Sequence, residues 1–281
     1  FMKIRTLQNH WFYKISGVWG NHEGSLLLWI SILVLFSLLF LFLNKDSEKK
    51  FRLFTLFFQN ILISGFLIFL LTNSNPFNEV YPPPKEGMGL NPILQDPALA
   101  IHPPLLYIGF VGSSIYFSAA LASLISKFNG KEFAKSIKHW VLISWFFQTV
   151  GILVGSIWAY YELGWGGYWF WDPVENSSLM PWFLMTALIH SILILQRKEG
   201  IYLWVVVLSI LTFTMSVTGT FLVRSGVLNS VHTFANDPSR GLYILTFLTL
   251  MIFLSIFVFY KYAPKETRNF EFLSKEFFII I

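Results

Sequence analysis

Seven runs of mostly apolar residues, each about as long as a bilayer is thick, constrain this chain more than any other feature. A hydrocarbon core of about 30 Å needs roughly 20 residues of helix. The runs cover residues 25–43, 53–72, 105–126, 139–159, 180–196, 201–223 and 241–260. Because lipid offers no water, each backbone amide must bond within its own segment, which selects helices. The sequence therefore predicts an all-α fold, a polytopic bundle of about seven transmembrane helices in a lipid bilayer.

The composition excludes other classes of protein. With 55% hydrophobic and only 12% charged residues, a soluble domain of 281 residues could not cover its surface with polar groups. The net charge of +5 does not indicate a nucleic-acid-binding protein, because the basic residues lie in short connections where membrane topology accounts for them. The chain has no cysteine, so any thiol chemistry must use a partner's cysteines.

The basic residues predict the orientation of the bundle. Alternate connections share one side of the membrane, and one set holds Lys45, Lys49, Lys50, Arg52, Lys127, Lys131, Lys135, Lys138, Arg197, Lys198, Lys261, Lys265 and Arg268. The opposite set holds only Lys85, Arg224 and Arg240. By the positive-inside rule, the lysine-rich side faces the cytoplasm or matrix. The chain then divides into an outer segment (1–24), a transmembrane bundle (25–262) and an inner tail (263–281).

The outer connection at 160–179 is crowded with aromatic residues. Six of them lie between Tyr161 and Trp171, interleaved with three glycines. An aromatic belt at the membrane interface accounts for one or two such residues. Glycines let backbone and planar surfaces approach a ligand closely, so this cluster favours a platform for a flat apolar molecule. The platform residues we expect are Trp165, Tyr168, Trp169 and Trp171.

Two histidines fall on the same outer side as this loop. His102 precedes the third apolar run, and His232 follows the sixth. Either one alone is explained as an interfacial histidine. Two imidazoles on opposite faces of a planar ligand are what a six-coordinate haem iron uses. Their shared side, with the aromatic loop between them in sequence, favours His102 and His232 as haem ligands.

His190 lies inside the fifth apolar run, about ten residues from its outer end, which is roughly 15 Å deep at 1.5 Å per residue. An ionisable residue at that depth is costly and is a functional candidate by default. One interpretation is a neutral imidazole bonded to a neighbouring helix. The other is a ligand to a second, intramembrane haem, which needs a partner histidine that no apolar run of this chain supplies.

Three charged residues near the outer loops have two interpretations each. Arg224 could pair with a carboxylate such as a haem propionate, or it could extend to the interface as a snorkelling side chain. Asp172 belongs to the aromatic run that we associate with haem. With Glu175, it could instead cap a helix that enters the membrane at Pro173, which we favour over a catalytic role.

These residues resemble a known family. The run WGGYWFWD at 165–172 is similar to the tryptophan-rich "WWD" signature of haem-handling membrane proteins. The flanks WGNHEGSLLLW (19–29), GLNPILQDP (89–97), IHPPLLY (101–107) and TGTFLVRSGVL (218–228) narrow the resemblance to the CcmF family, subunits of the cytochrome c haem lyase. The resemblance extends from about residue 15 to 262.

The resemblance implies a function and a set of partners. The activity is that of a haem lyase subunit, which holds haem on the outer face for thioether attachment to apocytochrome c. His102 and His232 correspond to the two external haem ligands, and His190 to one of two intramembrane ligands of a haem b. A CcmE-type chaperone delivers the haem, and a CcmH-type subunit presents the apocytochrome.

Two departures from the family pattern qualify this expectation. Tyr168 stands where tryptophan is usual, which keeps a stacking face. Family members are about twice as long, and this chain resembles a middle portion without the second intramembrane histidine. We therefore expect a split-gene subunit completed by a complementary CcmF chain.

Other readings stay open at this stage. The chain could be a haem carrier or exporter that makes no bond, or a structural remnant in a larger assembly. The bias towards Phe, Ile, Asn and Lys is typical of an AT-rich genome and favours the mitochondrial inner membrane, with a bacterial inner membrane as the alternative. In either location the WWD loop is expected on the intermembrane-space or periplasmic side.

Overall fold

The computed structural model describes residues 11–79, 81–82, 94–164, 167, 169–228 and 238–265. These residues form helices α1 (Trp11–Ser16), α2 (His22–Leu43), α3 (Lys49–Asn73), α4 (Pro97–Ser126), α5 (Gly130–Glu162), α6 (Pro173–Arg197), η2 (Glu199–Ile201), α7 (Tyr202–Arg224) and α8 (Pro238–Tyr262). Seven of the helices are long and apolar enough to cross a membrane, and the described part contains no strand. The prediction of an all-α integral membrane bundle is therefore confirmed.

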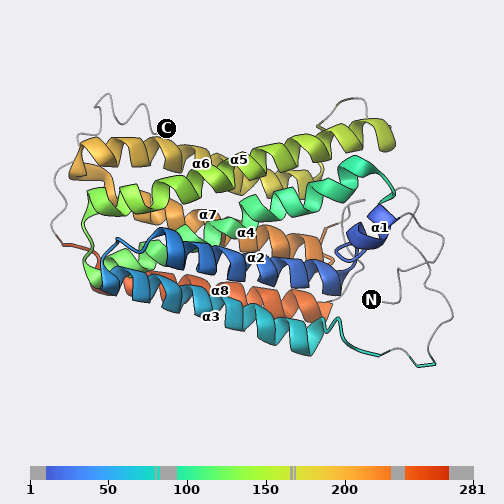
Figure 1. Cartoon of the computed structure of the whole chain (residues 1–281), viewed down its shortest axis with the longest axis horizontal. Coiled ribbons are helices and arrows are strands. Elements are labelled where there is room, and N and C mark those ends of the chain that lie inside the picture. Colours follow the sequence, from blue (N-terminus) through green and yellow to red (C-terminus); the bar gives the residue numbers. More distant parts are fainter. Residues whose placement is uncertain are drawn as a thin grey trace.

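Helix α4 is the centre of the bundle. In its most apolar stretch 89% of the residues are buried, against 28% in α8. Figure 1 shows α5 and α6 along one edge of the bundle and α3 and α8 along the other, with α4 between them. The short helix α1 lies near the first turns of α4. Because α4 contacts α2, α3, α5, α7 and α8, side chains from most of the bundle can meet around it.

The helices are longer than the apolar runs that predicted them. Helix α4 begins at Pro97 instead of 105, because the Asp96 side chain caps it by accepting from the amides of Ala98 (2.8 Å) and Leu99 (3.1 Å). Proline at the first helical position suits such a start. His102 therefore lies inside α4, followed by two prolines that the helix accommodates.

Helix α5 likewise begins at Gly130 instead of 139, capped by Asn129. Helix α6 begins at Pro173 instead of 180. At the other end of the chain, α2 begins at His22, so this histidine belongs to the bundle and not to the outer segment. Hydropathy marks the part of a helix that lipid surrounds, whereas capping residues mark where the helix itself ends.

Helices α4 and α5 pack closely because glycines face the contact. A Cβ atom added at Gly109 or Gly151 would lie 2.5 or 2.8 Å from backbone atoms of the facing helix. A Cβ at Gly155 would lie 2.5 Å from Cε1 of His102. Glycines four residues apart, as Gly151 and Gly155 are, let transmembrane helices approach to backbone contact. This spacing brings His102 against α5.

A polar cluster in the apolar interior fixes α2 and α3 against α4. Gln59 on α3 is fully buried, and its Nε2 donates to Ser114 Oγ (2.9 Å) and to the Leu33 carbonyl (3.3 Å). Ser118 Oγ donates to Gln59 Oε1 at 3.0 Å. Hydrogen bonds of this kind hold membrane helices in register, because lipid offers the same groups no alternative partner.

Candidate functional site

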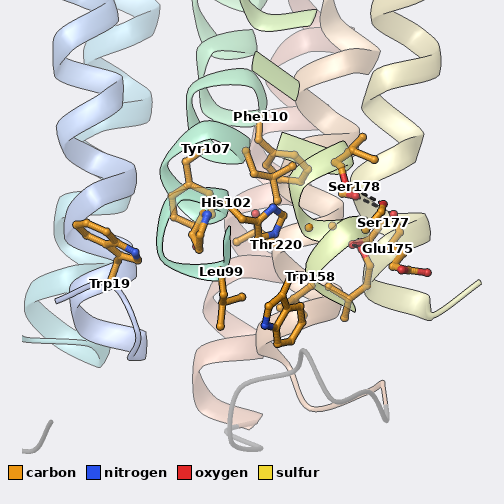
Figure 2. A pocket seen from close by; sticks show the side chains of 18 of the residues that line it. Trp19, Leu99, His102, Tyr107, Phe110, Trp158, Glu175, Ser177, Ser178 and Thr220 are labelled. Atoms are coloured by element: carbon orange, nitrogen blue, oxygen red, sulfur yellow. Dashed lines mark hydrogen bonds between the residues drawn. The ribbon is translucent and has the colours of Figure 1, made fainter. Parts of the chain in front are cut away.

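A cavity of about 330 Å³ opens at the end of the bundle opposite the lysine-rich connections. Small-molecule sites typically begin at about 300 Å³. The lining comes from the first turns of α2, α4 and α6 and the last turns of α5 and α7. Figure 2 shows His102, Tyr107, Phe110 and Trp158 around it, with Trp19 on one side and Glu175 on the other.

His102 forms part of the cavity wall in a defined tautomer. Its Nδ1 lies 2.7 Å from the carbonyl oxygen of Gly151 on α5. A carbonyl can only accept, so Nδ1 carries the proton and Nε2 carries the lone pair of the neutral ring. Histidines that bind metals through Nε2 are commonly oriented by this kind of bond from Nδ1 to a backbone carbonyl. The close contact with Gly155 holds the ring against α5.

Of the aromatic residues expected to form the platform, the structure places one in the cavity. Trp169 lines the cavity and is half-buried. Trp171, which meets Trp169 edge to face with ring centroids 6.3 Å apart, is 71% exposed and does not line it. Trp165 and Tyr168 lie outside the described residues. A second tryptophan that the sequence did not single out, Trp158 on α5, completes this side of the wall.

Asp172 and Glu175 form a capping box at the start of α6. The Asp172 carboxylate accepts from the Val174 amide at 2.9 Å, and Glu175 Oε2 accepts from the amides of Phe170 (3.1 Å) and Asp172 (3.2 Å). The helix-capping interpretation is therefore confirmed. Asp172 is buried but does not line the cavity, whereas Glu175 does.

The capping box also holds the end of the aromatic loop in a strained conformation. Trp171 has a φ of 61°, in the left-handed region that residues other than glycine rarely adopt. Its carbonyl accepts from Asn176 Nδ2 at 3.0 Å. Together with the bonds to Glu175, this contact ties the loop to the first turn of α6 and fixes where the tryptophans lie.

Arg224 lines the cavity at the last turn of α7. The residue is only 2% exposed, so the snorkelling interpretation is wrong. Its guanidinium donates to Ser25 Oγ (2.9 Å), to Tyr107 Oη (3.2 Å) and to the carbonyl of His22 (3.3 Å). The guanidinium thus joins α7 to α2 and α4 beside the cavity.

His190 lies far from the cavity, on the outward surface of α6. The side chain is exposed, and its Nδ1 donates to the carbonyl of Thr186 in the same helix at 2.8 Å. It is not bonded to a neighbouring helix through this nitrogen. The rings of Trp145 and Trp182 stack with centroids 6.1 Å apart at the contact of α5 with α6.

The structure therefore brings together His102, Trp169 and Arg224 and separates them from His190. His232 lies outside the described residues, so its pairing with His102 stays a prediction. Tyr107, Trp29 and Gly155 are site residues that sequence reasoning missed. Tyr107 and Trp29 stood within the family-like motifs, but nothing in the motifs indicated that Tyr107 would bond to Arg224 or that Trp29 would pack on Tyr107.

The fold and the cavity define a polytopic helical membrane protein with an outer-end pocket lined by histidine and tryptophan. Residues 19–229 match the model of the cytochrome c assembly protein family, which is most of the chain. The chain belongs to this family.

Curated relatives of the chain have names from cytochrome c biogenesis. The biogenesis protein CycK of Bradyrhizobium diazoefficiens is 51% identical over 266 residues, which is 94% of this chain and 40% of that protein. The biogenesis protein CcmF of Escherichia coli is 47% identical over 249 residues, 88% of this chain and 38% of its own length. A solved structure of "Cytochrome c Heme Lyase CcmF" superposes with a TM-score of 0.77 at 27% identity over 97% of this chain and 40% of that one. The chain thus spans about 40% of the length of these proteins.

Proposed function

We propose that this chain is a haem-holding portion of a cytochrome c haem lyase. The observation that carries the proposal is His102, which lines a cavity walled by tryptophans and donates Nδ1–H to the Gly151 carbonyl, so that Nε2 is the nitrogen with the lone pair. That tautomer is the one in which imidazole coordinates haem iron. In this proposal haem is the substrate that is handed on, with His102 on one face of the iron and His232 on the other.

The residues of the cavity suit a planar, amphiphilic substrate. Trp158 and Trp169 supply aromatic surface, and the buried guanidinium of Arg224 supplies positive charge for a carboxylate. Trp165, Tyr168 and Trp171 would belong to the same aromatic platform. The chain supplies a metal ligand, stacking surface and charge, which together orient haem.

The proposed reaction adds two thiols to the two vinyl groups of haem. Each addition breaks an S–H bond and the π bond of one vinyl group and forms one C–S and one C–H bond, so no atom is released and no external oxidant is needed. The thiols come from the C-x-x-C-H segment of an apocytochrome, which fits the absence of cysteine here. The contribution of this chain is to hold haem in one orientation while the peptide approaches.

The proposal includes partners and a location. A CcmE-type chaperone would deliver haem, and a CcmH-type subunit would present the apocytochrome. A complementary chain would supply the part of the relatives that this one does not span. The membrane would be the mitochondrial inner membrane, or a bacterial inner membrane, with the cavity facing the intermembrane space or periplasm.

His190 would serve a second, intramembrane haem at the contact with the complementary chain. Its exposure on α6 supports this role, because a ligand from another polypeptide could reach it there. The bond from Nδ1 to Thr186 leaves Nε2 as the coordinating nitrogen.

The test uses this chain co-produced with its complementary segment in a bacterium that lacks its own family member. Covalent haem on a reporter c-type cytochrome is measured by haem staining and by the pyridine haemochrome spectrum. We expect mature cytochrome with the unmodified chain and its loss with His102→Ala or His232→Ala. The matched control is His139→Ala, because His139 is exposed on α5 towards the lysine-rich end.

Two results would contradict the proposal. Haem that binds through His102 and crosses the membrane without thioether formation would identify a carrier. Mature cytochrome in undiminished amount with both variants would show that the cavity is a structural remnant.

A further inference from the structure

Two side chains of opposite charge line the cavity on different helices. Arg224 lies where α2, α4 and α7 meet, and the carboxylate of Glu175 lies on the α6 side. Glu175 is held there by the amides of Phe170 and Asp172. In a site of low polarity an anionic group is drawn to the first side and repelled by the second. A ligand with carboxylates at only one edge therefore has a preferred direction in this cavity.

Two neutral oxygens are among the hydrogen-bond partners of Arg224. Its guanidinium donates to Tyr107 Oη at 3.2 Å and to Ser25 Oγ at 2.9 Å, and neither oxygen carries charge. Tyr107 accepts this bond, so its own O–H is a donor for another group. Guanidinium and phenol donors side by side match the two oxygens of a carboxylate.

Trp29 adds a third donor beside Tyr107. The residue is 1% exposed, lines the cavity and packs edge to face on Tyr107 with ring centroids 5.7 Å apart. Its Nε1 has no hydrogen-bond partner among the described residues. A buried N–H without a partner costs free energy, so such a group indicates either strain or an absent acceptor. The neighbouring guanidinium favours an anionic acceptor.

We propose that Arg224, Tyr107 and Trp29, the carboxylate corner, bind the propionates of the porphyrin and set its direction in the cavity. This inference rests on the proposed function and adds to it the residues that orient the substrate. The propionates of protoporphyrin lie at one edge of the ring and the vinyl groups towards the other. Propionates at the carboxylate corner direct the vinyl edge towards α6 and the aromatic loop, where the thiols of an apocytochrome approach.

The experiment compares iron protoporphyrin IX with its dimethyl ester, which has the same ring, iron and vinyl groups but no carboxylate. Each is titrated into the purified full protein, and binding is followed by the Soret difference spectrum. We expect the diacid to bind at least tenfold more tightly than the diester. Tyr107→Phe and Arg224→Gln should bring the two affinities to within about threefold while leaving the affinity for the diester unchanged.

Two further variants complete the test. Trp29→Phe keeps the ring and removes only the N–H, so it should reduce the preference for the diacid by a smaller factor, about threefold. If Arg224→Gln does not fold, Tyr107→Phe carries the test, because it deletes a single hydroxyl. Trp204→Phe is the matched control, because Trp204 is 44% exposed on α7 away from the cavity lining, and it should leave the preference unchanged.

The outcomes separate this inference from the proposed function. Equal affinities for diacid and diester, with binding abolished by His102→Ala, would overturn the carboxylate corner and leave the haem site intact. Weakening of both ligands alike by the corner variants would also overturn it. Absence of any porphyrin binding that depends on His102 would overturn the proposed function and this inference together.

Discussion

His102 and His190 are held by the same kind of hydrogen bond but lie in opposite surroundings. Each donates Nδ1–H to a helix carbonyl, at 2.7 and 2.8 Å. The bond of His102 crosses from α4 to α5, in a cavity whose described walls all come from this chain. The bond of His190 stays within α6, on a face open to lipid or to another polypeptide. The chain thus builds one site around a histidine and presents another histidine outwards.

The difference has a cause in the packing of α5. On one face Gly151 and Gly155 let α4 approach until His102 touches the helix. Towards α6 the contact is made by two large pairs: Trp145 Nε1 donates to Thr186 Oγ1 (2.9 Å), and Trp182 Nε1 donates to Thr149 Oγ1 (2.8 Å). At the contact of α4 with α5, the two glycines let His102 pack against α5. At the contact of α5 with α6, the tryptophan and threonine pairs occupy the space between the helices, and His190 lies on the exposed face of α6.

The strongest test of this comparison is Gly155→Ala. The added methyl group would lie 2.5 Å from Cε1 and 2.7 Å from Nδ1 of His102, so the ring must move and lose its bond to Gly151. Loss of a bond that orients the ring should weaken haem binding at His102 by about tenfold or more. Titration with haem measures the effect. The control is Gly130→Ala at the lysine-rich start of the same helix, whose methyl group would meet the side chain of Tyr202, at 3.3 Å; equal losses in both variants would contradict the steric explanation.

The capping box gives the second prediction. Asp172→Ala removes the acceptor of the Val174 amide and should destabilise the start of α6 by about 1 kcal/mol. The aromatic loop should then be cleaved faster by protease, since its anchor to α6 is weakened. Asp96→Ala, which removes the equivalent cap of α4, should have a similar energetic cost without exposing this loop. An unchanged rate of loop cleavage in Asp172→Ala would show that the helix cap does not anchor the loop.

The reciprocal tryptophan and threonine pairs lead to a smaller expected effect. Thr186→Val keeps the shape of the side chain and removes the oxygen that accepts from Trp145. Hydrogen bonds between transmembrane helices contribute about 0.6 to 1.7 kcal/mol, so unfolding in mild detergent and denaturant should shift by an amount in that range. Thr149→Val should match it, because it removes the partner of Trp182. A shift in one variant only would show that the two pairs are not equivalent.

The smallest effect is expected for His190→Ala in the chain by itself. Because the side chain is exposed and bonds only to its own helix, the stability of the bundle should change by less than about 0.5 kcal/mol. Haem retained by the complex with the complementary chain should fall in the same variant. A large loss of stability without the complementary chain would mean that His190 packs within this bundle, and would remove the contrast with His102.

The bundle was predictable from the sequence, because length and hydropathy decide whether a segment can cross a lipid core. The starts of α4 and α6 were also within reach, since Asp96-Pro97 and Asp172-Pro173 each pair a capping residue with proline. Only the second was interpreted as a cap. The first was overlooked because the following His102, Pro103 and Pro104 interrupt the apolar run.

The detailed site was less accessible to sequence reasoning. Chain position placed His102 and Arg224 at the same end of the bundle, but whether a side chain points inwards depends on helix rotation. Rotation depends in turn on which neighbours can come close, as Gly155 allows for His102. The same ambiguity applied to His190, whose depth could be estimated from the sequence but whose outward direction could not.

The contacts of α2 have a consequence for how the protein is made. Its outer end is held by Arg224, whose partner Ser25 lies 199 residues earlier, and by Arg240, which meets Glu23 at 3.0 Å across 217 residues. At about 5 to 20 residues per second, a ribosome needs roughly 10 to 40 s to synthesise that interval. Helix α2 therefore enters the membrane before the residues that hold its outer end have been synthesised. The carboxylate corner cannot exist until the span ending at Arg224 has been inserted, so the proposed propionate contacts would form only after that step.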